Sequence, residues 1–544
     1  MQQQFIKLNS IANLNLYSNL CVLFYSIQFI YLNSSNRLTD TNYLIKDLLL
    51  NIIPISKNMN RTLYICLLAL TTSFMSGLVQ SDEIDEYIKQ QMDDRRIPGL
   101  QLAIVKNNKI VKNTNYGLAN LQDAIPVSNK TVFTINSMTK GFTGVAIMQL
   151  VEQGKLRLDV GISEYLTELP EAWRNLTIRQ LMGHTSGLPS ILGNWAGLIG
   201  SQDFDTAWDL AKQKPTEFKA DTDFKYNQTG YVLLGKIIDK VSGMSFDKFI
   251  TKHQLNKVGM IKTGDAGFAH FETVIPNQAR AYTYVKTGNL TNLSAEFAPP
   301  LRTAAGMTSS AKELAQWAIA LQTNKLFNKT DSLKQLWQPN ILADGKTAGF
   351  NRLVNGYALG WPVISRAEHP AVASLGANRS ALVIYPQDNL SIVVLTNLSG
   401  SLPSTFIDEI AGFYIADMKA ENGFGLPVSI KPLWTHLQKQ GYGSISKIAH
   451  KMQNQGDITL VEADVNTWGY QLLGRKKIAS AVQVFTLNTQ FFPASANTYD
   501  SLAEAYWLLG DGTKAIELYN KVLSLQPDNN NAKNQLQKIK AQSE

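Results

Sequence analysis

A serine and a lysine three residues apart, Ser137 and Lys140, have the types and spacing needed for covalent chemistry. A serine hydroxyl is a weak nucleophile until a base takes its proton. A lysine whose burial depresses its pKa can be that base. Residues 142–151 are apolar almost all round, so the pattern predicts a buried helix whose first turn carries both side chains on one face. Backbone N–H groups at the start of that helix would lie near an oxyanion formed at Ser137.

Spacing alone does not establish this chemistry, because Ser-x-x-Lys occurs four times in the chain. The pairs that begin at Ser245, Ser309 and Ser444 lie in polar surroundings, where a helix cap or a solvated face is expected. Only the pair at Ser137 opens a strongly apolar helix. For Ser137 taken alone, two interpretations are open: a catalytic serine, or an N-cap serine beside a surface lysine.

Composition describes a multi-domain globular protein of 544 residues, 44% hydrophobic and 17% charged, with a formal net charge of +8. No cluster of Lys and Arg with interleaved aromatic residues is present, so nucleic acid is not an expected partner. The six histidines are scattered without a His-Glu-x-x-His pattern, and we expect neither a metal site nor a cofactor. A strict Gly-x-Ser-x-Gly is also missing, so an α/β-hydrolase elbow is not indicated.

The elements expected to position the Ser137 helix are of mixed type. Helices are predicted over 82–94 and 176–181 and after a loop that ends near Tyr231, and strands over 100–105, 109–114, 380–385 and 391–396. The last two strands form a hairpin across 386–389. The predicted fold class is α+β: an antiparallel sheet with flanking helices, an all-helical subdomain, and an all-α tail.

Several motifs that follow the serine carry a family resemblance: Ser137-Met-Thr-Lys140; His184-Thr-Ser-Gly-Leu-Pro189; Phe224-Lys-Tyr226-Asn-Gln228-Thr-Gly-Tyr231; Gly306-Met307; and Val394-Leu-Thr-Asn397. With this order and spacing, the segment from about 84 to about 416 resembles the penicillin-recognising serine hydrolases. It looks most similar to the branch of class C β-lactamases, D-amino peptidases and related esterases.

The resemblance implies a β-lactamase/transpeptidase-like fold with the site between the helical subdomain and the sheet. It makes Ser137 the acylated nucleophile, Lys140 its base partner and Tyr226 the residue that shuttles protons to the leaving group and to water. It requires no cofactor. His184, in the family's Gly/Pro loop, is expected to make a structural hydrogen bond.

Two departures from the family pattern affect substrate binding. Gln228 stands where the family has Asn, which offers the same amide on a longer stem. The family's third motif, Lys-Thr-Gly or His-x-Gly, is best placed at Ser374-Leu-Gly376, with the Ala377 N–H as second oxyanion donor. Serine lacks the charge that would bind a substrate carboxylate.

Two other residues are alternatives for that missing function. His369 is the second choice for the base of the third motif, although Pro370 suits the start of a strand poorly. Arg379 is an alternative source of the charge, against the simpler interpretation that it is a surface arginine.

The N-terminal region has the pattern of a targeting segment. Residues 59–81 have the layout of a secretory signal peptide, and 1–58 are interpreted as an upstream extension without structural role, with a genuine N-terminal anchor as the alternative. Cys21 and Cys66 both precede the predicted cleavage after Ser81, so the mature protein would have no disulfide. We expect a periplasmic or secreted protein.

The sequence pattern changes after residue 416, and the domain boundaries follow from that change. We assign 82–420 to the hydrolase, 421–460 to a linker and 461–544 to tetratricopeptide-like helical repeats. The repeat is a 34-residue offset at which Ala481, Phe485 and Pro493 recur as Ala515, Tyr519 and Pro527. Such a tail either binds a protein partner or stabilises the protein as an appendage.

The sequence therefore predicts an exported serine hydrolase that cleaves an ester or amide bond in a small-molecule or peptidoglycan-like substrate. Its predicted catalytic residues are Ser137, Lys140 and Tyr226, and its predicted substrate or oxyanion contacts are Gln228, Ser374, Gly376 and Ala377. A true β-lactamase and a catalytically inactive binding protein are the alternatives.

Processing gives the first testable prediction. Mature protein recovered from an exporting host should begin near Asp82, as measured by N-terminal sequencing. A stable product that begins at Met1 or its neighbours would contradict the upstream-extension interpretation.

Overall fold

The computed structural model describes residues 83–192, 204–268, 274–284, 288–293, 299–351, 353–419, 424–427, 429–474 and 477–543. The predicted extension over 1–58, the predicted signal peptide over 59–81 and both cysteines lie outside the described residues. Within these ranges, no helix has both the length and the apolar character needed to cross a membrane.

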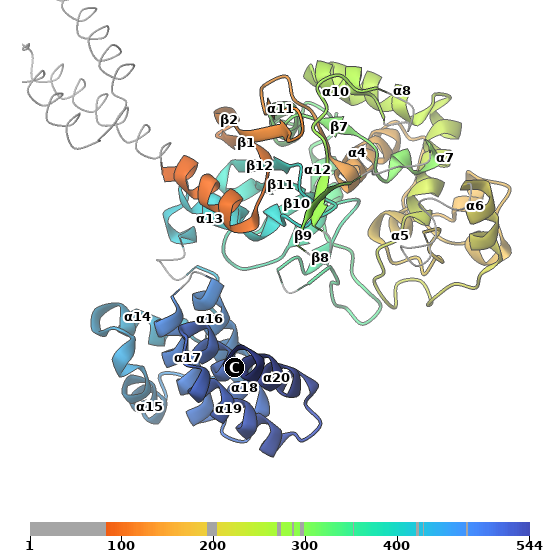
Figure 1. Ribbon diagram of the computed structural model, residues 1–544. Coiled ribbons are helices and arrows are strands. Elements are labelled where there is room, and N and C mark those ends of the chain that lie inside the picture. The colour runs from red at the N-terminus through yellow and green to blue at the C-terminus, as the bar shows by residue number, and fades with distance from the viewer. Residues whose placement is uncertain are drawn as a thin grey trace, which may run out of the picture. The chain divides into compact units, whose positions relative to one another are not determined.

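The hydrolase domain is built on an eight-stranded sheet in the order β3-β2-β1-β12-β11-β10-β9-β8, with antiparallel pairing throughout (Figure 1). Its strands are β1 (Gly99–Lys106), β2 (Lys109–Asn120), β3 (Ile125–Pro126), β8 (Gly356–Tyr357), β9 (Pro362–Ile364), β10 (Ala371–Gly376), β11 (Ser380–Tyr385) and β12 (Leu390–Thr396). The predicted hairpin is β11 and β12, which pair directly. β1 pairs with β12, so the two ends of the domain meet at the centre of the sheet.

The central strands are buried on both faces because successive side chains enter different cores. On β11, Leu382 and Ile384 belong to one hydrophobic cluster, whereas Val383 belongs to another. β12 alternates in the same way, which is the period of two expected of a strand. The sheet therefore has a covered layer on each side, as an α+β layered fold requires.

Helices supply those two layers. A helix over 83–95 contributes Ile84 and Ile88 to the cluster on one face, where α13 (Ile407–Gly412) also packs. On the other face, α11 (Ala311–Gln322) and α4 (Thr139–Glu152) share the largest cluster. The remaining helices of this domain are α5 (Ile178–Gly183), α6 (Phe204–Gln213), α7 (Thr229–Ser242), α8 (Phe246–Ile250), α9 (Asn256–Val258), α10 (Ile261–Ala266) and α12 (Thr330–Trp337).

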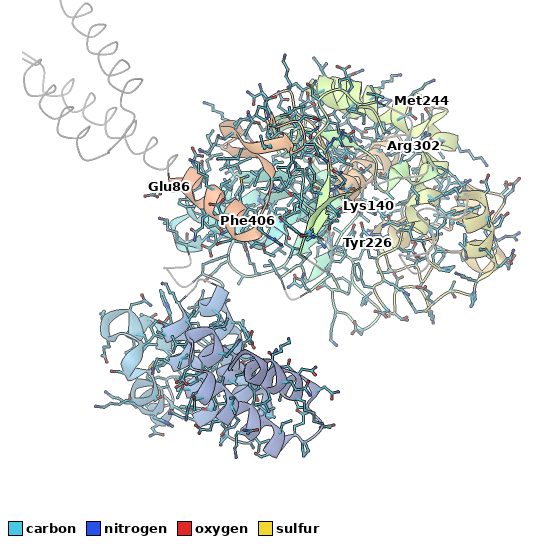
Figure 2. All side chains as sticks on the ribbon, viewed as in Figure 1. Glu86, Lys140, Tyr226, Met244, Arg302 and Phe406 are labelled. Carbon is cyan, nitrogen blue, oxygen red and sulfur yellow. The ribbon has the colours of Figure 1, made fainter. Side chains whose placement is uncertain are left out.

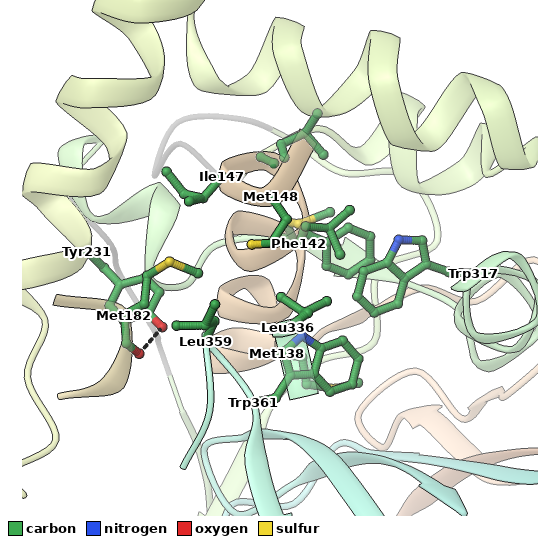
Figure 3. Packing of buried hydrophobic residues seen from close by; sticks show 14 of the residues in the cluster. Met138, Phe142, Ile147, Met148, Met182, Tyr231, Trp317, Leu336, Leu359 and Trp361 are labelled. Carbon is green, nitrogen blue, oxygen red and sulfur yellow. Dashed lines mark hydrogen bonds between the residues drawn. The ribbon is translucent and has the colours of Figure 1, made fainter. Parts of the chain in front are cut away.

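The predicted serine helix forms in two pieces. A 3-10 turn, η1 (Asn136–Met138), holds Ser137 and runs directly into α4, whose residues 139–150 are all buried. Figure 3 shows this helix in its core, with Phe142 stacked on Trp317 at 3.9 Å between ring centroids. The same view shows Tyr231 on α7 donating its hydroxyl to the Met182 carbonyl at 3.0 Å. The predicted antiparallel sheet with flanking helices is confirmed, and it is the fold that the family resemblance implied.

Two small two-stranded sheets complete the domain. They are β4 (Phe133–Thr134) with β7 (Thr308–Ser309), and β5 (Tyr282–Tyr284) with β6 (Leu290–Asn292). The first pair leads straight into η1, which we call the nucleophile turn after the predicted role of Ser137, since Thr134 is two residues before Asn136.

The C-terminal region is all-α, as predicted, and has a hydrophobic cluster of its own. Its helices are α14 (Lys431–Gln440), α15 (Ile445–Gln455), α16 (Glu462–Gly474), α17 (Ile478–Phe491), α18 (Ala496–Leu509), α19 (Gly512–Leu525) and α20 (Asn530–Ser543). α16, α18 and α20 begin at 462, 496 and 530, so their starts are 34 residues apart. This spacing equals the predicted period, and the tetratricopeptide assignment stays a prediction.

The predicted linker over 421–460 is wrong in extent. It contains α14 and α15, and Leu433, Leu437 and Ile445 are buried in the same cluster as the repeats. The sequence interpretation followed the Gly and Pro content of 421–427 and missed the apolar spacing behind it. These two helices extend the helical tail toward its N-terminal side.

The close packing of α4 gives a stability prediction. A Cβ added at Gly144 would lie 2.4 Å from the Leu359 carbonyl oxygen, whereas one added at Gly264 on α10 would meet nothing within 4 Å. Gly144→Ala should lower the free energy of unfolding by about 1–3 kcal/mol through overpacking. Gly264→Ala, the matched control, should change it by no more than about 1 kcal/mol, since alanine favours the helix. Urea titration followed by tryptophan fluorescence measures both, and equal effects would contradict the packing account.

Candidate active site

The side chains of Ser137 and Lys140 meet as predicted. Lys140 Nζ lies 3.3 Å from Ser137 Oγ and donates to the Ala304 carbonyl oxygen at 2.9 Å. Because the 3-10 turn continues into α4, the two residues project from the same side of the chain. Only 1% of Lys140 is exposed, so the amine is almost completely removed from water.

Burial lowers the pKa of Lys140 well below its usual value. Desolvation disfavours the ammonium form, so the environment favours the neutral amine. The Ala304 carbonyl holds one N–H, and the lone pair of the neutral amine can then accept the Ser137 hydroxyl proton. The geometry suits a general base at this nucleophile.

Tyr226 lies on the loop before α7 and faces the same amine. Figure 2 shows Lys140 and Tyr226 close together, and Lys140 Nζ is 4.7 Å from the centre of the Tyr226 ring. Burial raises the pKa of Tyr226, and hydrogen bonds with the side chains of Ser137 and Gln228 act in the opposite direction. The phenol therefore stays protonated at neutral pH and is placed to pass a proton rather than to act as a phenolate.

Gln228 lines the cavity above the serine. Its side chain hydrogen bonds with Tyr226, while its Oε1 is buried without a hydrogen-bond partner among the described residues. An unmatched buried acceptor is costly unless a ligand supplies the donor. The amide thus keeps the capacity for substrate contact that the family's Asn would have.

Residues 374–376, to which the sequence analysis assigned the third motif, lie on β10, and their side chains point in two directions. Leu375 and Ala377 line the cavity. Ser374 does not: it is 2% exposed, and its Oγ donates to the Met138 carbonyl at 3.2 Å. A Cβ at Gly376 would lie 2.0 Å from the Ile135 carbonyl, so only glycine permits this close approach of β10 to the nucleophile turn.

Ala377 follows β10 with a φ of 45°, and its backbone N–H is on the strand end that borders the cavity. Ser137 lines the same cavity. The sequence analysis predicted the Ala377 N–H as second oxyanion donor beside N–H groups at the start of the Ser137 helix, and this assignment stays a prediction.

The two histidines considered above have different surroundings. His184 caps α5 with a φ of 61°, and its Nδ1 accepts the Asn227 N–H at 3.1 Å, which is a structural hydrogen bond. His369 is held by Asp388 at 2.9 Å and Asp417 at 3.1 Å and does not line the cavity.

The interpretation of Arg379 as a surface arginine is wrong. Only 2% of Arg379 is exposed, and its Nη2 donates to Asn136 Oδ1 at 3.1 Å. Burial lowers the pKa of Arg379 to about 10, which leaves the guanidinium charged at neutral pH.

The cavity that contains Ser137 has a volume of about 420 Å³. Among the described residues that line it, none carries a formal charge, and the apolar ones come from several distant segments: Leu192, Leu301, Ala304, Ala305, Phe350, Val354, Tyr357, Pro362, Leu375 and Leu402. Sequence analysis missed most of this wall, because these residues belong to no motif. The described residues also hold no group of three His, Cys, Asp or Glu able to bind a metal.

The depressed pKa of Lys140 gives a prediction with a definite sign. Between the native pKa and the unfolded value near 10.5, the unfolded chain binds more protons, so stability rises with pH. Lys140→Met should remove this slope and raise the melting temperature at neutral pH, and the gain should shrink toward pH 10. Lys112→Met is the control, since it breaks a 2.5 Å ion pair with Asp85 and should lower the melting temperature. Calorimetry at several pH values measures both, and a lowered melting temperature for Lys140→Met at neutral pH would contradict the assignment.

Comparisons with known proteins agree with the geometry. The beta-lactamase family profile matches residues 84–417. Protein flp from Staphylococcus aureus is 28% identical over 336 residues, which cover 60% of this chain and 65% of flp. The chain thus spans less than two thirds of that relative's length.

Solved structures share the fold. The octameric penicillin-binding protein homologue from Pyrococcus abyssi superposes with a TM-score of 0.53 at 24% identity, covering 65% of this chain and 81% of that one. EstCE1, a hydrolase with promiscuous acyltransferase activity, superposes with a TM-score of 0.53 at 20% identity, covering 62% and 99%. With the profile spanning more than half of the chain, and with the Lys140 amine next to Ser137 Oγ and the Tyr226 ring, the protein belongs to the beta-lactamase family.

Proposed function

We propose that this protein is an exported serine hydrolase that opens an ester bond through an acyl-enzyme at Ser137. The observation that carries the proposal is the buried Lys140 amine, 3.3 Å from Ser137 Oγ, beside an apolar cavity. Membership of a family of serine hydrolases supports it.

In the proposed reaction, Ser137 Oγ attacks the substrate carbonyl while its proton passes to Lys140. The N–H groups of Ser137 and Ala377 stabilise the oxyanion. Tyr226 delivers its proton to the leaving group and regains one from the Lys140 ammonium, and the acyl group stays on Ser137. Water then attacks the acyl carbonyl, its proton passes through Tyr226 to Lys140, and Ser137 Oγ takes a proton back as the acid product leaves.

The wall of the cavity supports an uncharged substrate with an apolar acyl group. A substrate carboxylate beside the scissile bond is bound most strongly by a cationic partner, and none of the described residues of the wall is charged. Ser374, at the position of the family's Lys or His, faces Met138 instead of the cavity. These features favour an esterase over a true β-lactamase, which is the alternative function within the same class of enzyme.

Loss of either member of the Ser137–Lys140 pair should abolish hydrolysis of a short-chain nitrophenyl ester. Ser137→Ala and Lys140→Ala should each lower kcat/KM at least about 1,000-fold, and the double variant should be little worse, because the two act as a unit. Ser245→Ala is the matched control, since Ser245 has the same spacing to Lys248. Near-normal activity of Lys140→Ala would show that another group is the base.

Mass spectrometry separates an enzyme from an inactive binding protein. Incubation with a fluorophosphonate should add one phosphonyl group to Ser137 in the wild type and none in Ser137→Ala. An unmodified wild type would overturn the proposed function and favour the inactive alternative.

Substrate preference gives a further prediction. Uncharged short-chain esters should be cleaved with higher kcat/KM than cephalosporins. Leu375→Lys should reduce this difference in kcat/KM by a factor of about 10 to 100, because a charged hydrogen bond to a carboxylate contributes roughly 1.5–3 kcal/mol. Leu375 is the better test position than Ser374, where a lysine would be forced against Met138 and Gly141. Wild-type preference for the cephalosporin would overturn the esterase proposal.

We also propose that the helical tail binds a protein partner outside the cytoplasm. The support is the regular 34-residue spacing of α16, α18 and α20, which is typical of repeat scaffolds. Size-exclusion chromatography of the full chain with candidate partners from the exporting host tests it, and equal elution with and without them contradicts it.

A further inference from the structure

A buried arginine stands behind the nucleophile turn without an acidic partner. Arg379 is 2% exposed, and its one side-chain hydrogen bond among the described residues is from Nη2 to Asn136 Oδ1 at 3.1 Å. Its Nε is buried and unpartnered, and no described carboxylate forms a salt bridge with it. Arg366, by contrast, pairs with Asp408 at 2.8 Å.

Such an arrangement costs stability. A guanidinium taken out of water without a counter-charge loses solvation that a single amide oxygen replaces only in part. Burial lowers the pKa of Arg379 to about 10 but leaves the charge in place at neutral pH. Features that reduce stability in this way occur at functional sites, where the geometry they enforce is used.

The partner of Arg379 is itself unusual. Asn136 is 2% exposed and has a φ of 51°, a left-handed conformation, in the position immediately before Ser137. Its Nδ2 donates to the Thr134 carbonyl at 3.2 Å while its Oδ1 accepts from Arg379. The amide is therefore held at both ends, and it fixes the direction in which the chain enters the nucleophile turn.

Two further contacts tie the same turn to the β10–β11 hairpin. Ser380 Oγ donates to the Ile135 carbonyl at 3.1 Å, and Ser374 Oγ donates to the Met138 carbonyl at 3.2 Å. With the Arg379–Asn136 bond, these contacts flank Ser137 on both sides. The hairpin also carries Ala377, so they join the segments of the two oxyanion donors.

Arg379 is rigidly placed for this role. Its N–H donates to the Gly376 carbonyl at 3.0 Å, and its own carbonyl accepts the Thr396 N–H at 2.9 Å and the Thr396 hydroxyl at 3.0 Å. Of the three side chains of the β10–β11 hairpin described above that reach the turn, Arg379 is the longest and the one that contacts a side chain rather than a backbone carbonyl.

We infer that Arg379 is a positioning residue that, through Asn136, holds the backbone N–H of Ser137 at a fixed separation from that of Ala377. The inference rests on the proposed function, since it concerns the oxyanion site of the acyl-transfer reaction. Small displacements of such donors have large effects on rate, because they must face the charge that develops in the transition state.

The test uses full-length protein and a fluorophosphonate, with the maximal rate of inactivation and the half-saturating concentration measured separately. Arg379→Met should slow the maximal rate about 10- to 100-fold and leave the half-saturating concentration within about threefold, because alignment and not binding is lost. Asn136→Gly should act similarly, since glycine accepts the φ of 51° and only the side chain is removed. The double variant should be no slower than the slower single variant.

Controls separate this role from a general structural one. Arg379→Met should keep or raise the melting temperature, because it removes an unpaired buried charge. Arg366→Met, which breaks the pair with Asp408, should lower the melting temperature and leave the inactivation rate unchanged. An unmodified wild type would refute the proposed function itself. If the wild type is modified, any of three results would overturn the inference alone. These are an Arg379→Met variant that is inactivated as fast as the wild type, effects of the two single variants that multiply in the double variant, or a melting temperature of Arg379→Met that falls together with its inactivation rate.

Discussion

Removal of the Lys140 amine from water is the physical constraint on which the rest of the site depends. A lysine at the surface would be charged and unable to accept the Ser137 proton. Burial requires α4 to be covered on all sides, and the chain approaches it very closely: a Cβ at Gly360 would lie 2.6 Å from the Lys140 carbonyl oxygen. The sheet and the helical subdomain are both needed to cover this helix, and the cavity lies next to it.

Local patterns predicted the parts of the structure that depend on neighbouring residues. The apolar run after Lys140 and the β11–β12 hairpin follow from period and turn chemistry within a short window, whereas the strand at 374–376 was placed through the family resemblance. Ser374 was expected to contact the substrate, whereas its hydroxyl faces Met138, because spacing identifies a strand but does not say which face meets a cavity. Arg379 was expected at the surface because arginine usually is, and its burial results from contacts with η1, far away in sequence.

The wall of the cavity shows the same limit. Phe350, Tyr357 and Leu402 reach it from segments more than 100 residues after Tyr226, and no motif marks them. The linker was misjudged for a related reason: the Gly and Pro residues of 421–427 are a strong local signal, whereas the burial of Leu433 and Leu437 depends on helices further along the chain. Features that depend on tertiary packing were therefore the ones that sequence patterns did not predict.

Two basic residues, Lys140 and Arg379, are buried beside the same turn, and their different chemistry gives them different protonation states. Burial lowers both pKa values. Lysine starts near 10.5, so the same desolvation favours a neutral amine that can accept a proton. Arginine starts near 12.5 and remains a cation, with a pKa of about 10. One environment therefore suits Lys140 to the proposed role of base at Ser137 Oγ and keeps a positive charge at Asn136, and the two residues cannot exchange roles, because an arginine at position 140 would stay protonated.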